Sequence, residues 1–223
     1  MRQLLVCVLL LPPTAAFAQQ RPLVTEDPET IGAGHVLLEG GFDLASDVSY
    51  PVSGLTGTLL RLPTFGMNVG LSSIADLQID AGFHSRLNID SRERAPLSSM
   101  VTATGTSTFD VDDVVIGTKI RIAPETARRP GFGFRFATKL PNAGNESGLG
   151  LDTTDFFASI LVAKTVQSVR LVGNVGVGIL GDPTRGDRQN DVLTYGLSFA
   201  RALTQAAEVV GEVNGRQIGR AHV

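Results

Sequence analysis

Few side chains of this 223-residue chain are placed so that they could carry out catalysis together. The best candidate for a nucleophile and its base is the pair Ser85 and His84, within the alternating segment Leu77–Ile89. Neighbouring side chains of a strand point to opposite faces, so these two groups cannot act on one substrate. The pattern therefore predicts that the protein is not an enzyme.

Two further motifs that could bind a ligand are also in an unsuitable context. The glycines between Gly173 and Gly178 resemble a phosphate-binding loop, but they lie inside a predicted strand that no helix follows. Asp110, Asp112 and Asp113 could gather a Ca²⁺ ion, although the end of a solvated acidic loop is the simpler interpretation. We therefore expect no cofactor and no metal.

The remaining chemistry is that of charged side chains arranged along one face of several strands. In Phe132–Leu140, Arg135 and Lys139 stand on the face opposite to that of the phenylalanines. Because side chains of a strand alternate, such a segment has one polar and one apolar face. The polar faces predict an interior lined by Glu39, Asp80, His84, Arg86, Lys119, Arg121, Arg135, Lys139 and Arg170.

Two of these cations are expected to face each other. If a hairpin turns around Pro124, Lys119 lies opposite Arg135. Like charges directly across a ladder destabilise it. Either an inward acid neutralises them or the interior attracts anions, and a self-satisfied salt-bridge network that fills a narrow barrel is an equally good interpretation. The acids considered for this role are Glu39, Asp80 and Glu208.

Strand-like segments recur nine times, and the loops between them alternate between long and short. That rhythm is typical of an up-and-down barrel with short turns at one rim and longer loops at the other, and such barrels have an even number of strands. We predict an all-β, antiparallel, up-and-down transmembrane β-barrel, with nine visible strands of about 10–12 in the complete protein. The segments are about 35–44, 58–71 (with a bulge at Pro63), 77–89, 112–122, 132–140, 153–164 (register left open), 169–180, 193–199 and from 206 onward.

The apolar faces are predicted to contact lipid. A soluble ligand-binding barrel would place its apolar face inside and its charges outside. The loop rhythm, the number of strands and the glycines on the polar faces favour lipid outside instead. With no Trp and only two Tyr in the sequence, aromatic girdles at the membrane surfaces would consist mostly of Phe.

Both ends of the chain are predicted to lie outside the barrel, which occupies 35–216. Residues 1–18 have the features of a signal peptide and contain the single cysteine, Cys7. Residues 19–34 are expected to trail in the periplasm as an N-terminal segment, rather than fold into the interior as a plug. Residues 217–223 are predicted to be a non-native tail on a C-terminally truncated barrel, because the codons for Ile218–Val223 match a common sequencing adapter.

The segments RPLVTEDPETIGAGHVLLEGGFDL (21–44) and DVVIGTKIRIAPETARRPGFGFRFATKLP (113–141) resemble a family of outer-membrane transporters. That family is assigned by association with the meta-pathway of phenol degradation. The resemblance implies a barrel of about a dozen strands and passage of small hydrophobic or aromatic compounds, and it transfers no catalytic or binding residues.

The expected function is therefore passive passage of small compounds, hydrophobic or aromatic ones included, through the bacterial outer membrane. The expected partners are outer-membrane lipid, the barrel-assembly machinery during insertion and the small-molecule cargo. A net charge of −3 without a basic run excludes a nucleic-acid partner. The alternatives are a non-conducting structural or surface barrel and a soluble periplasmic ligand-binding barrel.

Overall fold

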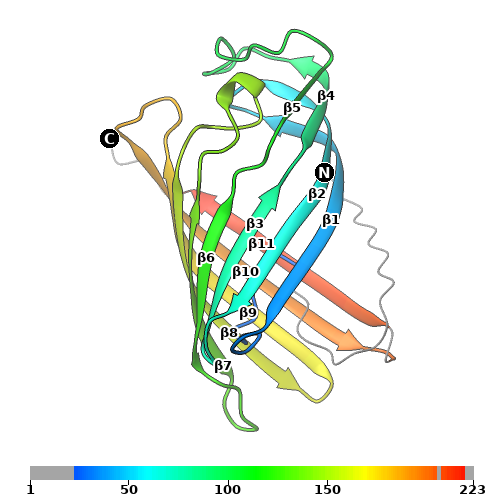
Figure 1. Cartoon of the computed structure of the whole chain (residues 1–223), viewed down its shortest axis with the longest axis vertical. Helices are drawn as coiled ribbons and strands as arrows, with labels where there is room; N and C mark the ends of the chain where they lie inside the picture. The colour runs from blue at the N-terminus through cyan, green and yellow to red at the C-terminus, as the bar shows by residue number, and fades with distance from the viewer. Residues whose placement is uncertain (1–22, 205–206, 219–223) are drawn as a thin grey trace.

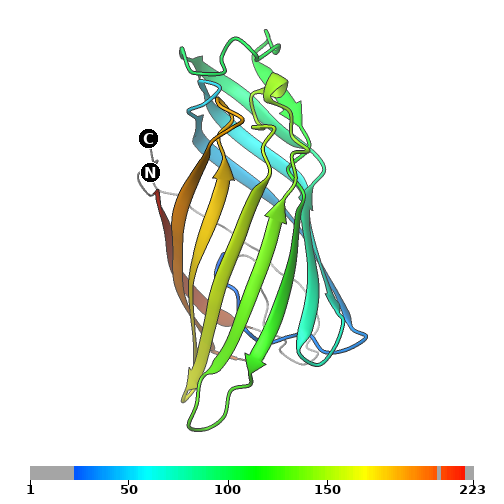
Figure 2. The same cartoon turned by 90° about the vertical axis from the view of Figure 1, so that its left-hand side faces the viewer.

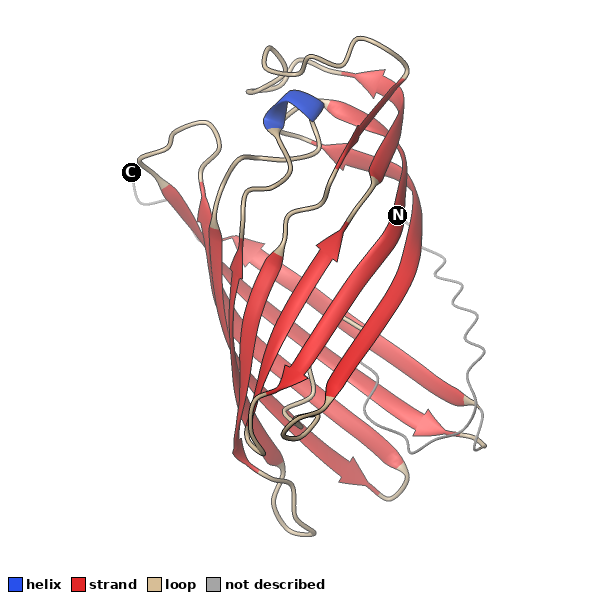
Figure 3. Ribbon diagram, in the orientation of Figure 1, coloured by secondary structure: helices blue, strands red, loops and turns tan. Residues whose placement is uncertain are grey.

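The alternating segments form a single antiparallel sheet in a computed structural model that describes residues 23–204 and 207–218 (Figures 1 and 3). The described residues contain one 3₁₀ turn, Asn145–Ser147, and no helix long and apolar enough to cross a membrane. The eleven strands are β1 (Val36–Tyr50), β2 (Leu55–Gly70), β3 (Ala75–Gly82), β4 (Ser85–Arg92), β5 (Ser107–Asp110), β6 (Val115–Ala123), β7 (Gly131–Lys139), β8 (Asp155–Val166), β9 (Val169–Gly181), β10 (Gln189–Ala202) and β11 (Glu208–Ile218).

From β6 to β11, each strand pairs with the next one along the chain, and β1 pairs with β2. The sheet curves strongly, so that β10 and β11 pass behind β2 and β3 in Figure 1, and Figure 2 shows the same curvature from the side. β1 and β11 each pair with a single strand, as does the short β5, and no pairing joins β1 to β11 within the described residues.

The predicted strand 77–89 is two strands, β3 and β4, which separate at Phe83 and His84. β3 pairs with the C-terminal half of β2, and β4 pairs with its N-terminal half. The same division separates β5, which pairs with β4, from β6, which pairs with β3. The structure therefore has eleven strands where nine are predicted, because the predicted strand 77–89 is two strands and β5 lies between two predicted strands.

The break coincides with Pro63 in β2, where the sequence predicts a bulge. Pro63 has no N–H to donate to a ladder, and β2 indeed has one extra residue here relative to β1. Arg61 pairs with Ser85 and Thr64 pairs with Gly82, so two residues separate the paired positions on each strand. The buried residues of β3 include Asp76 and Gln78, with even numbers, whereas those of β4 are Ser85 and Leu87, with odd numbers. The faces of the strands are therefore exchanged across this point.

The two faces of the sheet differ sharply in exposure. The face that carries Lys119, Arg135 and Ser198, called the inner face below, is largely buried, and the opposite or outer face is exposed. Lys119 is 3% exposed, whereas the next residue, Ile120, is 41% exposed. The alternation predicted for β6, β7, β9 and β10 is confirmed. The register left open for β8 places Asp155, Leu161 and Ala163 on the inner face.

Beyond the break, the inner face becomes apolar. Leu55, Leu59 and Leu87 form a buried cluster there. Five partly buried residues pack against it: Val48, Tyr50, Ile89, Val101 and Leu149. Val101 and Leu149 belong to the long connections that follow β4 and β7, so these loops cover one end of the inner face.

The last strand continues further than the sequence predicts. β11 pairs with β10 up to Ile218, which lies opposite Val192. Gln217 and Ile218, the first two residues of the predicted tail, therefore continue the ladder. Residues 219–223 of the predicted tail lie outside the described residues.

Candidate functional site

The N-terminal segment Val24–Ile31 lies across the inner face of the sheet. At one end, the backbone N–H groups of Val24 and Thr25 donate to Glu212 of β11. At the other end, the N–H of Ile31 donates to Asp76 of β3 at 3.1 Å. The segment is predicted to trail away from the strands, but it contacts them. The physical reason is that acidic side chains of the segment form ion pairs with basic groups on the inner face.

Side chains of the central strands hold the middle of the segment. The Thr25 hydroxyl donates to the Ser198 hydroxyl on β10 at 2.6 Å. Asn174 on β9 makes two hydrogen bonds to Glu26, since its Oδ1 accepts from the backbone N–H and its Nδ2 donates to the carbonyl. One amide side chain thereby satisfies both backbone groups of Glu26.

The predicted pairing of Lys119 with Arg135 is confirmed by the register of β6 and β7. Glu26 reaches between them, with its carboxylate 3.6 Å from Lys119 Nζ and 3.6 Å from Arg135 Nε. Asp76 lies 4.0 Å from Lys119 Nζ, and Arg135 Nε donates to Gln78 Oε1 at 2.7 Å. The like charges across the ladder are thus offset mainly by an acid from the N-terminal segment.

The acids predicted for that role lie elsewhere on the sheet. Glu39 and Asp80 share the inner face in one row, both opposite Gly66 of β2. Glu208 is exposed in β11, opposite Ala202. Glu26 is absent from the predicted lining residues, as are its neighbours Asp27 and Glu29 of the same segment.

Arg170 holds the next acid of the segment. Its Nε and Nη2 donate to the two carboxylate oxygens of Asp27 at 2.8 and 2.7 Å, the side-by-side geometry that a guanidinium offers to a carboxylate. Its Nη1 donates to Glu125, in the turn between β6 and β7. Glu125 also accepts from the N–H of Thr165 and pairs with Lys164 at 3.2 Å.

The Asp27 and Glu125 carboxylates therefore both pair with the Arg170 guanidinium. Partial burial acts to raise the pKa of the Glu125 carboxyl, but the hydrogen bonds from Thr165 and Lys164 and the charge of Arg170 outweigh it. The pKa of Glu125 is consequently lower than its ordinary value.

The remaining predicted cations of the inner face are also paired. Arg121 donates to Glu29 at 2.5 Å and to the carbonyl of Ser73 at 2.6 Å. Lys139 lies 2.8 Å from Asp113 and 3.2 Å from Asp155. Each of these contacts joins strands or loops that are distant in sequence.

His84 and Arg86, also predicted to line the interior, are exposed and face outward. His84 stacks on Phe109 of β5, with 5.8 Å between the ring centroids. Arg86 lies opposite Leu60 and Phe109 on the exposed face of β4. The prediction is wrong for these two residues because it treats 77–89 as one uninterrupted strand, whereas the faces are exchanged at Phe83 and His84.

Glycines on the inner face leave room for the segment. A Cβ atom added to Gly133 of β7 would lie 2.9 Å from Cβ of Pro28, and one added to Gly196 of β10 would lie 2.6 Å from Cγ2 of Thr25. Both distances are too short for ordinary contacts. A side chain at either position would therefore press against the segment.

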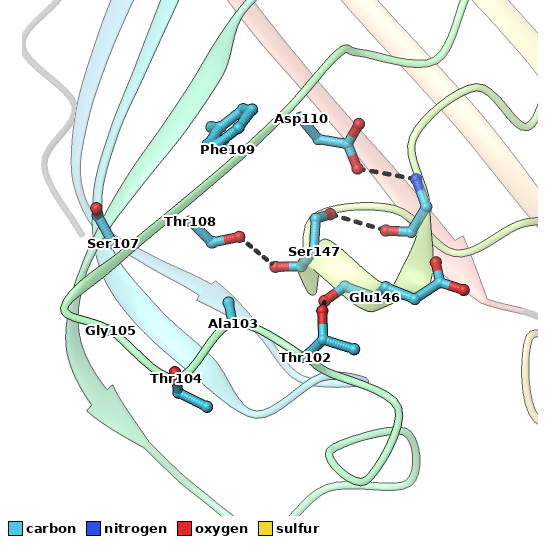
Figure 4. A pocket seen from close by; sticks show the side chains of 11 residues that line it. Thr102, Ala103, Thr104, Gly105, Ser107, Thr108, Phe109, Asp110, Glu146 and Ser147 are labelled. Carbon is cyan, nitrogen blue, oxygen red and sulfur yellow. Dashed lines mark hydrogen bonds between the residues drawn. The ribbon is translucent and has the colours of Figure 1, made fainter.

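A polar cleft of about 600 Å³ lies at the loop end of the sheet, between the 102–110 stretch and the 3₁₀ turn (Figure 4). Its hydrogen-bonding groups are largely engaged with one another. The Thr108 hydroxyl donates to the Ser147 carbonyl at 2.8 Å, and Asp110 accepts from the N–H of Gly144 at 2.9 Å. These contacts connect the two loops rather than present a set of free groups to a ligand.

The three aspartates considered for Ca²⁺ are held by separate partners. Asp110 accepts from Gly144, Asp112 contacts Arg61 and Ser85, and Asp113 contacts Lys139 and accepts from the N–H groups of Asn142 and Ala143. No cluster of three metal-binding side chains occurs within residues 23–204 and 207–218. The chain matches no protein-family model and no curated protein sequence.

Proposed function

We propose that the chain forms an outer-membrane β-barrel through which small compounds pass, with the inner face of the sheet as the lining of the passage. One observation carries this proposal: charged side chains are on the buried inner face, while large apolar side chains are on the exposed outer face. Soluble proteins seldom expose so many large apolar groups together. An apolar outer band and a polar interior are the arrangement expected of a transmembrane barrel.

The outer face is apolar over many strands. Ile122 is 69%, Phe136 58% and Val213 72% exposed. Transferring such surface from water to hydrocarbon contributes about 25 cal/mol per Å² of apolar area. Contact with lipid would therefore stabilise this face, whereas its exposure to water would cost free energy.

In the proposed barrel, the passage would be closed by groups on the inner face. Val24–Ile31 lies across the charged part of the inner face, and the Leu55, Leu59 and Leu87 cluster fills another part. Passage then requires these groups to move. Small hydrophobic or aromatic compounds are the proposed cargo, on the resemblance of residues 21–44 and 113–141 alone.

A non-conducting structural barrel is the second candidate. The ion pairs between the segment and Lys119, Arg121, Arg135 and Arg170 favour it, because a self-satisfied network needs no ligand. A soluble ligand-binding barrel fits less well, since its charges would be expected on the exposed face.

Fractionation of cells that express the full chain, followed by planar-bilayer recording, tests the proposal. We expect the protein in the outer-membrane fraction, released only by detergent, with a heat-dependent shift in gel mobility and discrete conductance steps. Insertion without conductance would favour the structural barrel. Recovery of the folded protein from the periplasmic extract without detergent would contradict both membrane candidates.

A further inference from the structure

The surface beneath Thr25–Glu29 combines cations with an apolar floor. Thr25 lies over Gly196 of β10, and Pro28 lies over Gly133 of β7. The segment therefore passes over β8 and β9, which lie between these strands. The apolar floor on these two strands is formed by Leu161, Ala163 and Val172, which are 0, 1 and 7% exposed.

Basic groups flank this floor. Arg170 is two residues from Val172 on β9 and therefore lies on the same face. Arg135 is likewise two residues from Gly133, whose partner on β8 is Leu161. From β7 to β10 the floor and its edges span about three strand spacings, roughly 14 Å. A compound with a single ring fits such a span.

The cations already bind carboxylates in this position. Arg170 donates hydrogen bonds to both carboxylate oxygens of Asp27, and the Glu26 carboxylate lies between Arg135 and Lys119. These carboxylates belong to a segment that has no helix or strand structure and is attached to the sheet mainly through side chains. Its departure would leave the strand ladders intact.

That departure would remove carboxylates from buried or half-buried cations. Lys119 would keep Asp76, and Arg170 would keep Glu125. Arg135 would lose the Glu26 carboxylate and Arg121 would lose that of Glu29. Leaving a charge in a poorly solvated place without a counter-charge is costly, so an anion that takes the place of the segment would be stabilised there.

We propose that this surface is a binding site for small organic anions that join a carboxylate to an apolar body, such as aromatic carboxylates. The acids of Glu26 and Asp27 occupy the positions of the ligand carboxylate, and Pro28 occupies part of the place of its apolar body. The ligand and the segment compete for one site, so binding displaces the segment. This inference rests on the proposed function only in treating the inner face as reachable by solutes.

A cysteine-accessibility experiment tests the competition. The single native cysteine is replaced (Cys7→Ser), and the buried Thr25 becomes a reporter (Thr25→Cys) in the full chain, folded in detergent. The rate of modification by a charged, water-soluble thiol reagent is measured with benzoate or with benzamide, its uncharged analogue of similar shape. Benzoate is expected to raise the rate about tenfold, a typical size for coupling between competing states, and benzamide is expected to leave it unchanged.

Two further variants separate anion recognition from general loosening. The double change Arg135→Gln and Arg170→Gln is expected to abolish the difference between benzoate and benzamide. Arg185→Gln, in an exposed loop, is the matched control and is expected to keep it. If the double variant does not fold, the comparison of benzoate with benzamide in the Thr25→Cys reporter alone still tests whether the anion displaces the segment.

Equal effects of the two compounds, or no effect of benzoate, would overturn the inference. Conductance is recorded separately on the same preparation. A conducting protein that ignores benzoate would contradict this inference alone, whereas a benzoate-responsive protein that never conducts would contradict only the proposed passage.

Discussion

At the scale of single residues, the inner face shows how two neighbouring strands can carry cations directly opposite each other. Lys119 and Arg135 are direct neighbours across the ladder between β6 and β7. Glu26 offsets their repulsion from above the sheet, and Gln78 accepts from Arg135 while donating to Glu26. Removing one member of such a network leaves its partners poorly satisfied, so its parts are expected to act together.

Replacing Gly133 by Val tests how closely the segment fits the sheet. Val favours strands, so we expect β7 to persist. A Cβ atom at this position would lie only 2.9 Å from Cβ of Pro28, so we expect the segment to move away from the sheet. In the Thr25→Cys reporter, thiol modification should become about tenfold faster, as for a local opening shifted by about 1.4 kcal/mol. Gly186→Val is the control, since nothing lies within 4 Å of an added Cβ there. Similar rates in both variants would contradict the observed packing.

The Glu125 carboxylate makes a pH-dependent contribution to stability. Its pKa is lowered in the folded state, so its contribution is present above the ordinary pKa of about 4.3 and is lost as the pH falls through the folded value. Glu125→Gln should lower the free energy of unfolding by about 1 kcal/mol at pH 7, the size of a partly exposed ion pair. The deficit should shrink between pH 7 and pH 3, as the carboxyl becomes protonated.

Thermal unfolding in detergent at both pH values measures this difference. Asp187→Asn, in an exposed loop, is the matched control for loss of a carboxylate. A deficit for Glu125→Gln that is equally large at low pH would show that the carboxylate charge is not its source.

At the scale of elements, the strands could be predicted from the sequence because period-two alternation is a local property. Ile116, Ile120 and Ile122 on one face, with Lys119 and Arg121 on the other, suffice to orient β6. The exchange of faces near Pro63 could not be derived in the same way. It depends on the pairing of β2 with β1, β3 and β4 at once. Because the sequence does not reveal this exchange, the prediction places His84 and Arg86 on the wrong face.

The position of the N-terminal segment depends on still more distant contacts. Thr25 and Glu212 are 187 residues apart in sequence, and Asp27 and Arg170 are 143 apart. No local pattern records such a contact. The available signal was charge complementarity between the acids of TEDPE, residues 25–29, and the excess of basic groups predicted on the inner face.

The apolar cluster should contribute strongly to the stability of the elements around it. Leu87 is fully buried, so Leu87→Ala should lower the free energy of unfolding by about 2–5 kcal/mol through lost contacts and a cavity. Val213→Ala, on the exposed outer face, should have a much smaller effect. Denaturant unfolding of both variants in the same detergent measures the contrast. Equal losses would contradict the assignment of the two faces.

At the scale of the whole molecule, the proposed membrane environment of the sheet is inferred from the placement of charged and apolar side chains on its two faces. Neighbours along a strand, such as Ser159 and Ile160 of β8, face opposite sides. Ile160 is 51% exposed, and many other apolar side chains of the outer face are exposed to a similar extent. The proposed passage and its closure by Val24–Ile31 both require lipid on that outer side.

Spin labels on paired neighbouring positions measure this orientation directly. In the Cys7→Ser chain inserted into lipid vesicles, labels are attached at Ile160→Cys and Val177→Cys on the outer face and at Ser159→Cys and Thr194→Cys on the inner face. We predict that the outer labels collide mainly with dissolved oxygen, which concentrates in hydrocarbon, and that the inner labels are more accessible to a water-soluble nickel complex. The opposite pattern, with the outer labels in water and the inner labels in an apolar environment, would contradict the account.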